Sequence, residues 1–262
     1  MTGKKKTFGA EYLFAAIFLI IAAVVIGRQL NRSVVVTDIS VSGNRMSESV
    51  DIMHAGGLDA GVHADSIAFL EVIERVETLP WVASAYVSLS QSGQLRIRVE
   101  EEEPIALLVD GRRSAWVTES GIQLPVILGK DVDVPILHGF KVANTSVKAA
   151  GSSSGSPAVT AAGSIPDTLK SPLFEPARDF LMQVRKSPGL YAMISEMMVT
   201  ESDGVVALSN ENTVRLTFGH EDFDQRIRKW QAFQSQVISG KGISHVRSLD
   251  FRYRGQVVAL ER

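Results

Sequence analysis

The sequence predicts an α+β protein with an N-terminal transmembrane helix, a β-α-α-β-β domain and then a mixed β domain with flanking helices. Three observations carry this prediction. An uncharged apolar stretch follows a lysine cluster near the N-terminus, two helical patterns precede an alternating strand pair, and short strands between turn residues fill most of the remainder. A chain of 262 residues is long enough for one or two domains with hydrophobic cores of their own.

The composition excludes several classes of function. A hydrophobic share of 45% and a charged share of 21% are typical of a folded globular protein. The formal net charge of −2 provides no broad basic field, so no nucleic-acid partner is predicted. The chain has no cysteine, which excludes a disulfide framework, a zinc site with cysteine ligands and a thiol nucleophile.

The N-terminal segment predicts a membrane anchor. Lysines occupy positions 4–6, and the uncharged run YLFAAIFLIIAAVVIG follows at residues 12–27. A buried helix of a soluble domain would need apolar cover on every side, and a cleaved signal peptide would need a small-residue cleavage site before Arg28. We therefore expect a cytoplasmic tail at residues 1–11 and a transmembrane helix at residues 12–30, because basic residues mark the cytoplasmic end. The rest of the chain would then lie outside the cytoplasm.

The first outer domain is predicted at residues 34–103. The run VVVTDISVS is rich in β-branched residues and predicts a strand, which a Gly-Asn turn follows. Two short helices come next, and the apolar residues of a final strand pair alternate with arginines, as in a hairpin with one buried face. The expected order is strand 34–42, a helix from Ser47 or Glu48 to Gly56, a helix from Asp65 or Ser66 to before Pro80, strand 82–89 and strand 94–99.

The second of these helices has a predicted core face. Ile67, Leu70, Ile73 and Val76 recur at three-residue steps, so we expect these side chains to face the sheet. Trp81 lies between this helix and the next strand, in the run LPWV, and is interpreted first as a core residue.

The second outer domain is predicted at residues 104–262. Its expected elements are strands 105–109 and 114–118, helix 174–185, strands 198–200, 205–208 and 214–218, a helix over 222–238 and a terminal strand at 248–260. An insert at about 143–166 is rich in Ala, Gly, Ser and Thr. It cannot bury enough apolar surface to offset its ordering entropy, so it is predicted to be a flexible surface loop.

The search for a catalytic or metal site yields no candidate. The run GSSSG at residues 151–155 matches G-x-S-x-G, but that motif requires a preceding strand and a following helix, and here it falls within the insert. The histidines show no metal-ligand spacing. Four glutamates at residues 100–103 cannot converge on one point, because neighbours on a strand face opposite ways, so we expect a solvated strand end. No catalytic residue, metal ligand, cofactor or small-molecule substrate is predicted.

The terminal strand is the candidate binding surface. One interpretation is an ordinary closing strand whose aromatic residues lie in the core. The other is an exposed edge that accepts a strand from a partner protein through backbone hydrogen bonds. The candidate partner-binding residues are Asp250, Phe251, Arg252, Tyr253, Arg254, Gly255, Gln256 and Val257.

Several segments carry a resemblance in their order and spacing. They are ISVSGN at 39–44, LPWVASAYVSL at 79–89, LRIRVEEEEPIALL at 95–108, WVTESGIQLP at 116–125, VPILHG at 134–139 and SLDFRYRGQVVAL at 248–260. Behind one predicted membrane span, this set resembles the FtsQ/DivIB family of bacterial cell-division proteins. The first outer domain is similar to the POTRA domain of that family, and the second to its β domain.

The resemblance implies a non-enzymatic scaffold of the divisome at the septum, held in the cytoplasmic membrane with its C-terminal domains outside. Family members bind other division proteins and form a complex with two small bitopic coiled-coil proteins, FtsB and FtsL. The terminal strand of the family is a docking edge, and its D-x-R-Y segment corresponds to Asp250, Phe251, Arg252 and Tyr253. Two features depart from the family: the insert at 143–166 is long, and the arginine of a neighbouring strand has no counterpart around residues 203–206.

Two other functions compete with this one. An anchored envelope enzyme, such as a cell-wall hydrolase, would need a nucleophile or a metal constellation. A POTRA-bearing transport or outer-membrane assembly factor would need many alternating strands of about ten residues, for which the remaining chain is too short.

Overall fold

The computed structural model describes residues 17, 19–23, 35–143, 168–238 and 243–262. Residues 17 and 19–23 of the predicted span are helical, and none of the helices within the described residues is long and apolar enough to cross a membrane. The predicted tail at 1–11, most of the predicted span at 12–30 and all but the first residue of the predicted insert at 143–166 lie outside the described residues.

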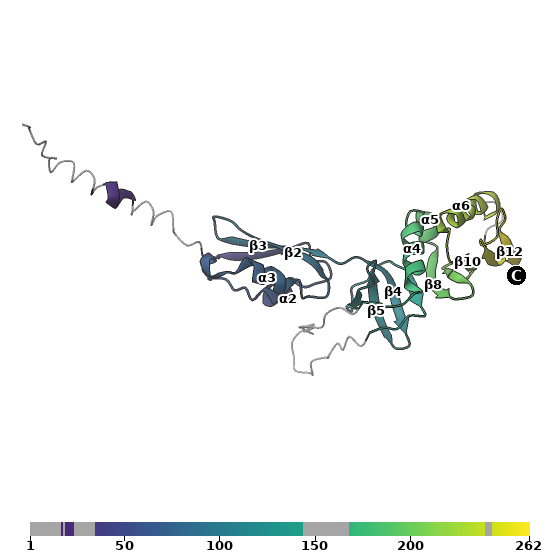
Figure 1. The fold of residues 1–262 in the computed structure, drawn as a ribbon, viewed down its shortest axis with the longest axis horizontal. Coiled ribbons are helices and arrows are strands. Elements are labelled where there is room, and N and C mark those ends of the chain that lie inside the picture. Colours follow the sequence, from purple (N-terminus) through teal and green to yellow (C-terminus); the bar gives the residue numbers. More distant parts are fainter. Residues whose placement is uncertain (1–16, 18, 24–34, 144–167, 239–242) are drawn as a thin grey trace, which may run out of the picture.

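The first unit is a three-stranded sheet with two helices on one face (Figure 1). The strands are β1 (Asp38–Ser42), β2 (Val82–Leu89) and β3 (Gln94–Glu101), in the order β1-β3-β2. β1 runs parallel to the central β3, and β2 runs antiparallel to it. The helices are α2 (Ser49–Gly56) and α3 (Phe69–Val76), with a short 3-10 turn at Ala64–Ser66 before α3. The predicted order of strand, two helices and hairpin is confirmed.

The core of the first unit corrects the predicted face of α3 at Leu70, which is 76% exposed. Val76 is buried as predicted, and Ile67 and Ile73 pack against the same core, whose other residue from α3 is Val72. The prediction fails at Leu70 because α3 begins at Phe69, after a 3-10 turn and a non-helical Ala68, so Ile67 lies outside the helix and does not continue its face. Residues four apart on one helix share a face, and Val72 and Val76 pack on the sheet.

The second unit is a mixed nine-stranded sheet in the order β12-β11-β10-β9-β8-β7-β4-β5-β6 (Figure 1). Its strands are β4 (Pro104–Asp110), β5 (Arg113–Thr118), β6 (Gln123–Pro125), β7 (Ile136–His138), β8 (Ile194–Thr200), β9 (Gly204–Ser209), β10 (Arg215–Gly219), β11 (Val246–Asp250) and β12 (Val258–Glu261). The helices are α4 (Phe174–Val184), α5 (Pro188–Tyr191) and α6 (Phe223–Phe233), and a π-helical turn at Gln234–Ile238 extends α6. One large core cluster joins α4 and α6 to the strands.

The prediction of a single terminal strand over residues 248–260 is wrong. The chain leaves the sheet after Asp250, turns through Gly255 with a φ of 72°, and returns as β12. Two local contacts explain the break. The backbone N–H of Arg252 donates to Asp250 Oδ1 (3.0 Å), and Lys229 Nζ donates to the carbonyl oxygen of Tyr253 (2.7 Å). Both contacts give the backbone hydrogen-bond partners other than a strand ladder.

An apolar cluster joins the two units. Trp81, which is 3% exposed, donates its indole N–H to the carbonyl oxygen of Pro125 at 3.1 Å. Met46 from the first unit and Trp116 and Leu124 from the second complete the cluster. The interpretation of Trp81 as a buried residue is confirmed, and its position shows that it packs between the units.

The acidic run at residues 100–103 makes specific contacts that were not predicted. The Glu101 carboxylate accepts three consecutive backbone N–H groups in the turn after β1. These come from Arg45 (2.8 Å), Met46 (2.8 Å) and Ser47 (2.7 Å). Glu103 forms an ion pair with Arg185 of the second unit. The expectation of a solvated strand end is therefore wrong for Glu101, whereas the Glu103 side chain is 74% exposed although it is paired with Arg185.

Glu101→Ala is expected to lower the free energy of unfolding by about 1–3 kcal/mol, because the substitution leaves partly buried N–H groups without a charged acceptor. Denaturant unfolding followed by tryptophan fluorescence measures the change. Glu100→Ala is the matched control, since Glu100 accepts an exposed hydrogen bond from Ser84 Oγ. Equal losses of unfolding free energy in the two variants would show that the hydrogen bonds from this turn to Glu101 do not stabilise the fold.

Candidate partner-binding edge

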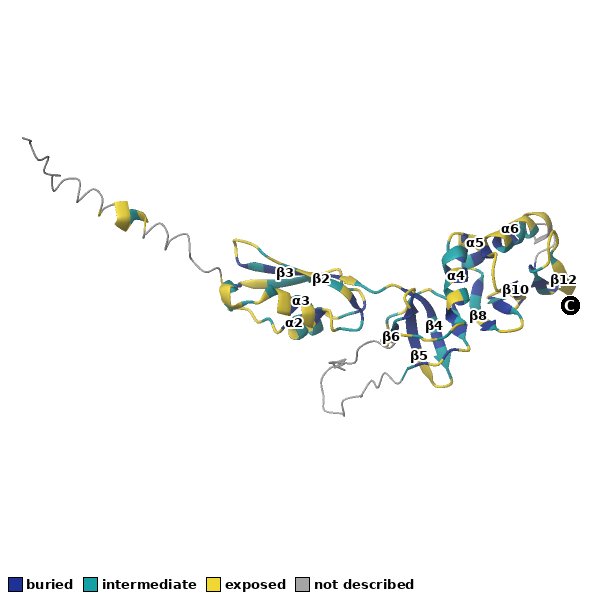
Figure 2. Ribbon diagram, in the orientation of Figure 1, coloured by how far each residue is buried: buried dark blue, intermediate teal, exposed yellow. Residues whose placement is uncertain are grey.

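β12 is the end strand of the nine-stranded sheet. Among the described residues its strand neighbour is β11, on one side. All four of its residues are exposed, including Val258 at 44% and Leu260 at 54%, and Figure 2 shows how this contrasts with the buried strands in the middle of the sheet. An exposed end strand with apolar side chains is able to pair with another strand.

The ladder of β11 shows which backbone groups of the hairpin face inward. The N–H of Phe251, just after β11, donates to the carbonyl oxygen of Thr217 on β10 (3.0 Å). Because successive residues of a strand direct their backbone groups to opposite sides, Asp250 and Ser248 direct theirs to β12.

The register then identifies the groups that face outward. Asp250 is paired with Val258, and Ser248 is paired with Leu260. The backbone groups of these two β12 residues therefore point to β11, whereas those of Ala259 and Glu261 point to the open side of the sheet. The outer edge consequently offers N–H and C=O groups from Ala259 and Glu261.

A charged network stabilises the turn before β12. The Arg252 guanidinium donates to both carboxylate oxygens of Asp250, with Nε at 3.0 Å from Oδ1 and Nη2 at 2.7 Å from Oδ2. Its Nη1 donates to Asp203 Oδ1 at 3.0 Å, and Asp203 also accepts from Arg215 of β10 at 2.8 Å. The network therefore connects the turn to the loop before β9 and to β10.

Aromatic contacts hold the same turn against β10 and α6. The Phe251 side chain is fully buried and stacks on Phe218 of β10, with ring centroids 5.0 Å apart and an interplanar angle of 14°. Trp230 of α6 meets it edge-on at 6.1 Å. Lys229, the neighbour of Trp230, donates to the carbonyl oxygens of Phe251 and Tyr253. Helix α6 thus determines where the turn lies.

Comparison with known proteins finds similarity to one group of cell-division proteins. The model of the FtsQ-type POTRA domain matches residues 34–102, which contain the three-stranded sheet and its two helices. A protein named "Cell division protein FtsQ" from Salinibacter ruber is 24% identical over 98% of this chain and 96% of its own length. Its namesake from Rhodothermus marinus is 25% identical over 87% of this chain and 78% of its own length, and that of Koribacter versatilis is 27% identical over 39% and 30%. Residues 34–102 thus match an FtsQ-type POTRA domain, and the chain is similar over most of its length to proteins named FtsQ.

This similarity to FtsQ proteins implies a role in cell division and protein partners in the division apparatus. The resemblance stated from the sequence motifs is therefore confirmed at the level of the family. The structure adds the mixed α+β architecture, with a POTRA domain followed by a large mixed sheet.

The eight candidate partner-binding residues lie together in the hairpin: Asp250 ends β11, and the other seven form the turn instead of a strand. Phe251 is fully buried and Val257 packs against the core, whereas Tyr253 is 49% exposed. Arg254, Gly255 and Gln256 are exposed, and Asp250 and Arg252 are partly buried in their mutual ion pair. Whether they bind a partner stays a prediction.

The sequence analysis missed the residues of the edge itself, β12. The run VVAL after Gly255 was treated as the end of one long strand. An isolated glycine within a strand pattern indicates a local break, so Gly255 could have separated the two strands.

The described residues contain no group of three or more His, Cys, Asp or Glu side chains positioned to hold a metal ion. His138 of β7 pairs with Glu196 of β8, with Nε2 and Oε2 3.0 Å apart on the partly exposed sheet surface. The GSSSG run at 151–155 lies outside the described residues.

The charged network predicts a pH dependence. Burial alone would raise the pKa of Asp250, but the side-chain and backbone hydrogen bonds from Arg252 outweigh burial and lower it. A carboxylate with a lowered pKa in the folded state stabilises the fold above its unfolded-state pKa of about 4, and this contribution is lost as the pH falls below that value.

We therefore expect Arg252→Ala to reduce the loss of stability between about pH 5 and pH 2 relative to the unmodified chain. Urea unfolding at a series of pH values measures this difference. Arg254→Ala is the control, because Arg254 is an exposed residue of the same turn. If the pH profiles of the unmodified chain and Arg252→Ala are parallel, the network does not carry the effect.

Proposed function

We propose that this protein is a membrane-anchored, non-enzymatic adaptor of the division septum that binds a partner by adding the partner's strand to β12. The observation that carries the proposal is the open outer edge of β12 at the end of the nine-stranded sheet. An enzyme or a transport factor is not favoured, because the relatives reported above are division proteins.

The chemistry of strand addition matches this edge. Backbone hydrogen bonds from Ala259 and Glu261 would provide affinity that does not depend on the partner's sequence. The exposed side chains of Val258 and Leu260 lie two residues apart on one face, and they would provide selectivity for a partner with apolar residues at matching positions. Tyr253, exposed in the adjoining turn, would extend the contact beyond the strand.

The proposed partners are small bitopic coiled-coil proteins of the FtsB and FtsL type, as the family resemblance implies. Each would contribute an extended segment outside the membrane. The proposed anchor is the run at 12–30, with residues 1–11 in the cytoplasm and the two sheets outside it. Its apolar sequence and the lysines at positions 4–6 support this orientation.

Ala259→Pro is expected to weaken partner binding about tenfold or more while the domain remains folded. Proline removes an N–H that points to the open side, and edge strands tolerate proline at such positions. Titration of the outer region with an FtsB-type partner measures the dissociation constant. Ala259→Val is the matched control because it retains the N–H, and circular dichroism checks the fold of each variant. Unchanged affinity in a folded Ala259→Pro variant would exclude β12 as the docking edge.

A fluorescent fusion of the whole chain is expected to form a midcell band in dividing bacterial cells. A fusion that lacks residues 1–30 is expected to lose membrane attachment and the band, because the proposed anchor is removed. Fluorescence microscopy with membrane fractionation measures both properties. An even distribution of the full-length fusion around the envelope, in cells that divide normally, would contradict the septal role.

A further inference from the structure

A cleft of about 370 Å³ lies at the joint between the two units. Its lining comes from the turn after β1, residues 101–104 at the junction of β3 and β4, the segment before β7 and the residues that follow α4 and end α5. Binding sites occur preferentially at such boundaries between domains, and their volumes range from roughly 300 to 1,000 Å³. The cleft lies near the lower limit, so it suits a side chain or a short segment of a partner better than a large ligand.

The apolar part of the lining is held in place before any ligand binds. Met46 and Trp81 are buried in the cluster that joins the units, and Val132 and Val134 pack against it. The carbonyl oxygen of Trp81 accepts the N–H of Glu102 at 2.9 Å, which fixes the backbone where the two sheets meet. A long side chain that entered the cleft would therefore lay its methylene groups on an apolar surface that is already ordered.

Carboxylates outnumber cations in this lining. Its charged residues are Arg45, Glu101, Glu102, Glu103, Asp133 and Arg185. Two of the carboxylates are already matched, because Glu101 accepts the N–H groups of the turn after β1 and Glu103 pairs with Arg185. Within the described residues, Glu102 and Asp133 have no ion pair and no side-chain hydrogen bond, and the exposed Arg45 has no ion pair. One unpaired cation thus stands against two unpaired carboxylates, and this excess of negative charge favours a cationic ligand.

A partly buried tyrosine adds an aromatic surface. Tyr191 ends α5 and lines the cleft. Burial raises the pKa of its phenol, the nearby Arg185 guanidinium opposes this shift, and the Asp133 and Glu103 carboxylates add to it. The phenol is therefore neutral at physiological pH. A neutral ring beside two carboxylates is a favourable surface for a guanidinium group, which stacks on aromatic faces and pairs with carboxylates through its planar set of donors.

We propose that the cleft is a docking site for an arginine side chain presented by a partner protein. Glu102 and Asp133 would accept its N–H groups, Tyr191 would supply the ring, and the valines beside Asp133 would contact apolar residues next to the arginine. Arginine fits better than lysine, whose ammonium is compact, strongly hydrated and unable to form two parallel hydrogen bonds with a carboxylate. The site shares no residue with β12 and adds no strand to either sheet, so it does not depend on the function proposed above.

The test uses the full chain in phosphatidylcholine nanodiscs and a fluorescein-labelled, capped Leu-Arg-Leu peptide, with binding followed by anisotropy and empty nanodiscs as the background. We expect saturable binding. A peptide with citrulline in place of arginine has nearly the same shape without the charge, and it is expected to bind about tenfold more weakly or worse. A lysine peptide is also expected to bind more weakly than the arginine peptide.

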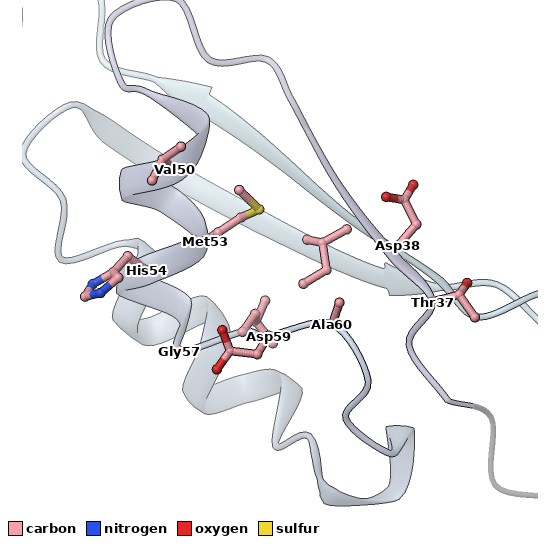
Figure 3. A pocket seen from close by; sticks show the side chains of 10 residues that line it. Thr37, Asp38, Val50, Met53, His54, Gly57, Asp59 and Ala60 are labelled. Carbon is pink, nitrogen blue, oxygen red and sulfur yellow. The ribbon is translucent and has the colours of Figure 1, made fainter. Parts of the chain in front are cut away.

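A matched pair of double variants locates the site. Glu102→Gln with Asp133→Asn removes both unpaired carboxylates of the cleft and is expected to weaken binding about tenfold or more. Asp59→Asn with Asp131→Asn removes the same charge from exposed positions outside the cleft and is expected to leave the affinity unchanged. Asp59 lines another hollow, of about 590 Å³, between β1 and α2 of the first unit (Figure 3), so this control also tests whether any hollow with a carboxylate suffices. Circular dichroism checks the fold of each variant.

Two further measurements separate a partner's arginine from other ligands. Free arginine is expected to compete far less well than the peptide, because it lacks the apolar neighbours, and Ala259→Pro is expected to bind the peptide normally, whatever its effect at β12. The proposal is overturned if the arginine peptide does not bind or if the citrulline or lysine peptide binds equally well. It is also overturned if the two double variants behave alike, if free arginine competes as well as the peptide, or if Ala259→Pro abolishes binding.

Discussion

The N–H and C=O groups of a strand need partners, and an end strand leaves one row of them unpaired by its own sheet. This constraint governs both units of the protein. In the large sheet, the pairing of β11 with β10 determines which backbone groups of β11 bond to β12. The backbone groups of Ala259 and Glu261 on β12 then point outward. In the small sheet, the chain itself supplies partners just before the end strand β1, because residues 61–62 bond Val36. The unpaired row of β12 defines where an extended partner can add.

The edge at β12 depends on side chains that are not part of it. Phe251 fills the core between Phe218 and Trp230, which holds the start of the turn against the sheet. Arg252 and Lys229 then bind carboxylate and carbonyl oxygens around the turn, so the chain reverses there instead of continuing as β11. A two-strand ribbon is marginal alone, and these contacts supply the support that places β12 at the end of the sheet.

The sequence predicted those parts of the fold that are encoded locally. The hairpin of β2 and β3 was recognisable because its apolar residues alternate with Arg96 and Arg98, and α4 because its buried residues recur at helical spacing. The exposure of Leu70 on α3 and the departure of the chain from the sheet after Asp250 were not recognised. The first depends on where the helix begins, and the second on contacts such as Arg252 with Asp203, which lies 49 residues away. The edge was missed for the same reason.

The joint between the units decides how the cleft and the edge of β12 could act together. Only residues 102 and 103 separate β3 from β4, and the joint is reinforced by the Trp81 cluster and by Lys130, whose Nζ contacts the carbonyl oxygen of Met46 at 2.8 Å and Glu48 at 2.9 Å. Such contacts restrict rotation between the two sheets. A partner that engaged both sites would therefore bind the second in an intramolecular step, and its gain in affinity would depend on whether its linker matches the fixed span between them. The contacts at the joint would thus affect the affinity for such a partner, although they do not touch β12.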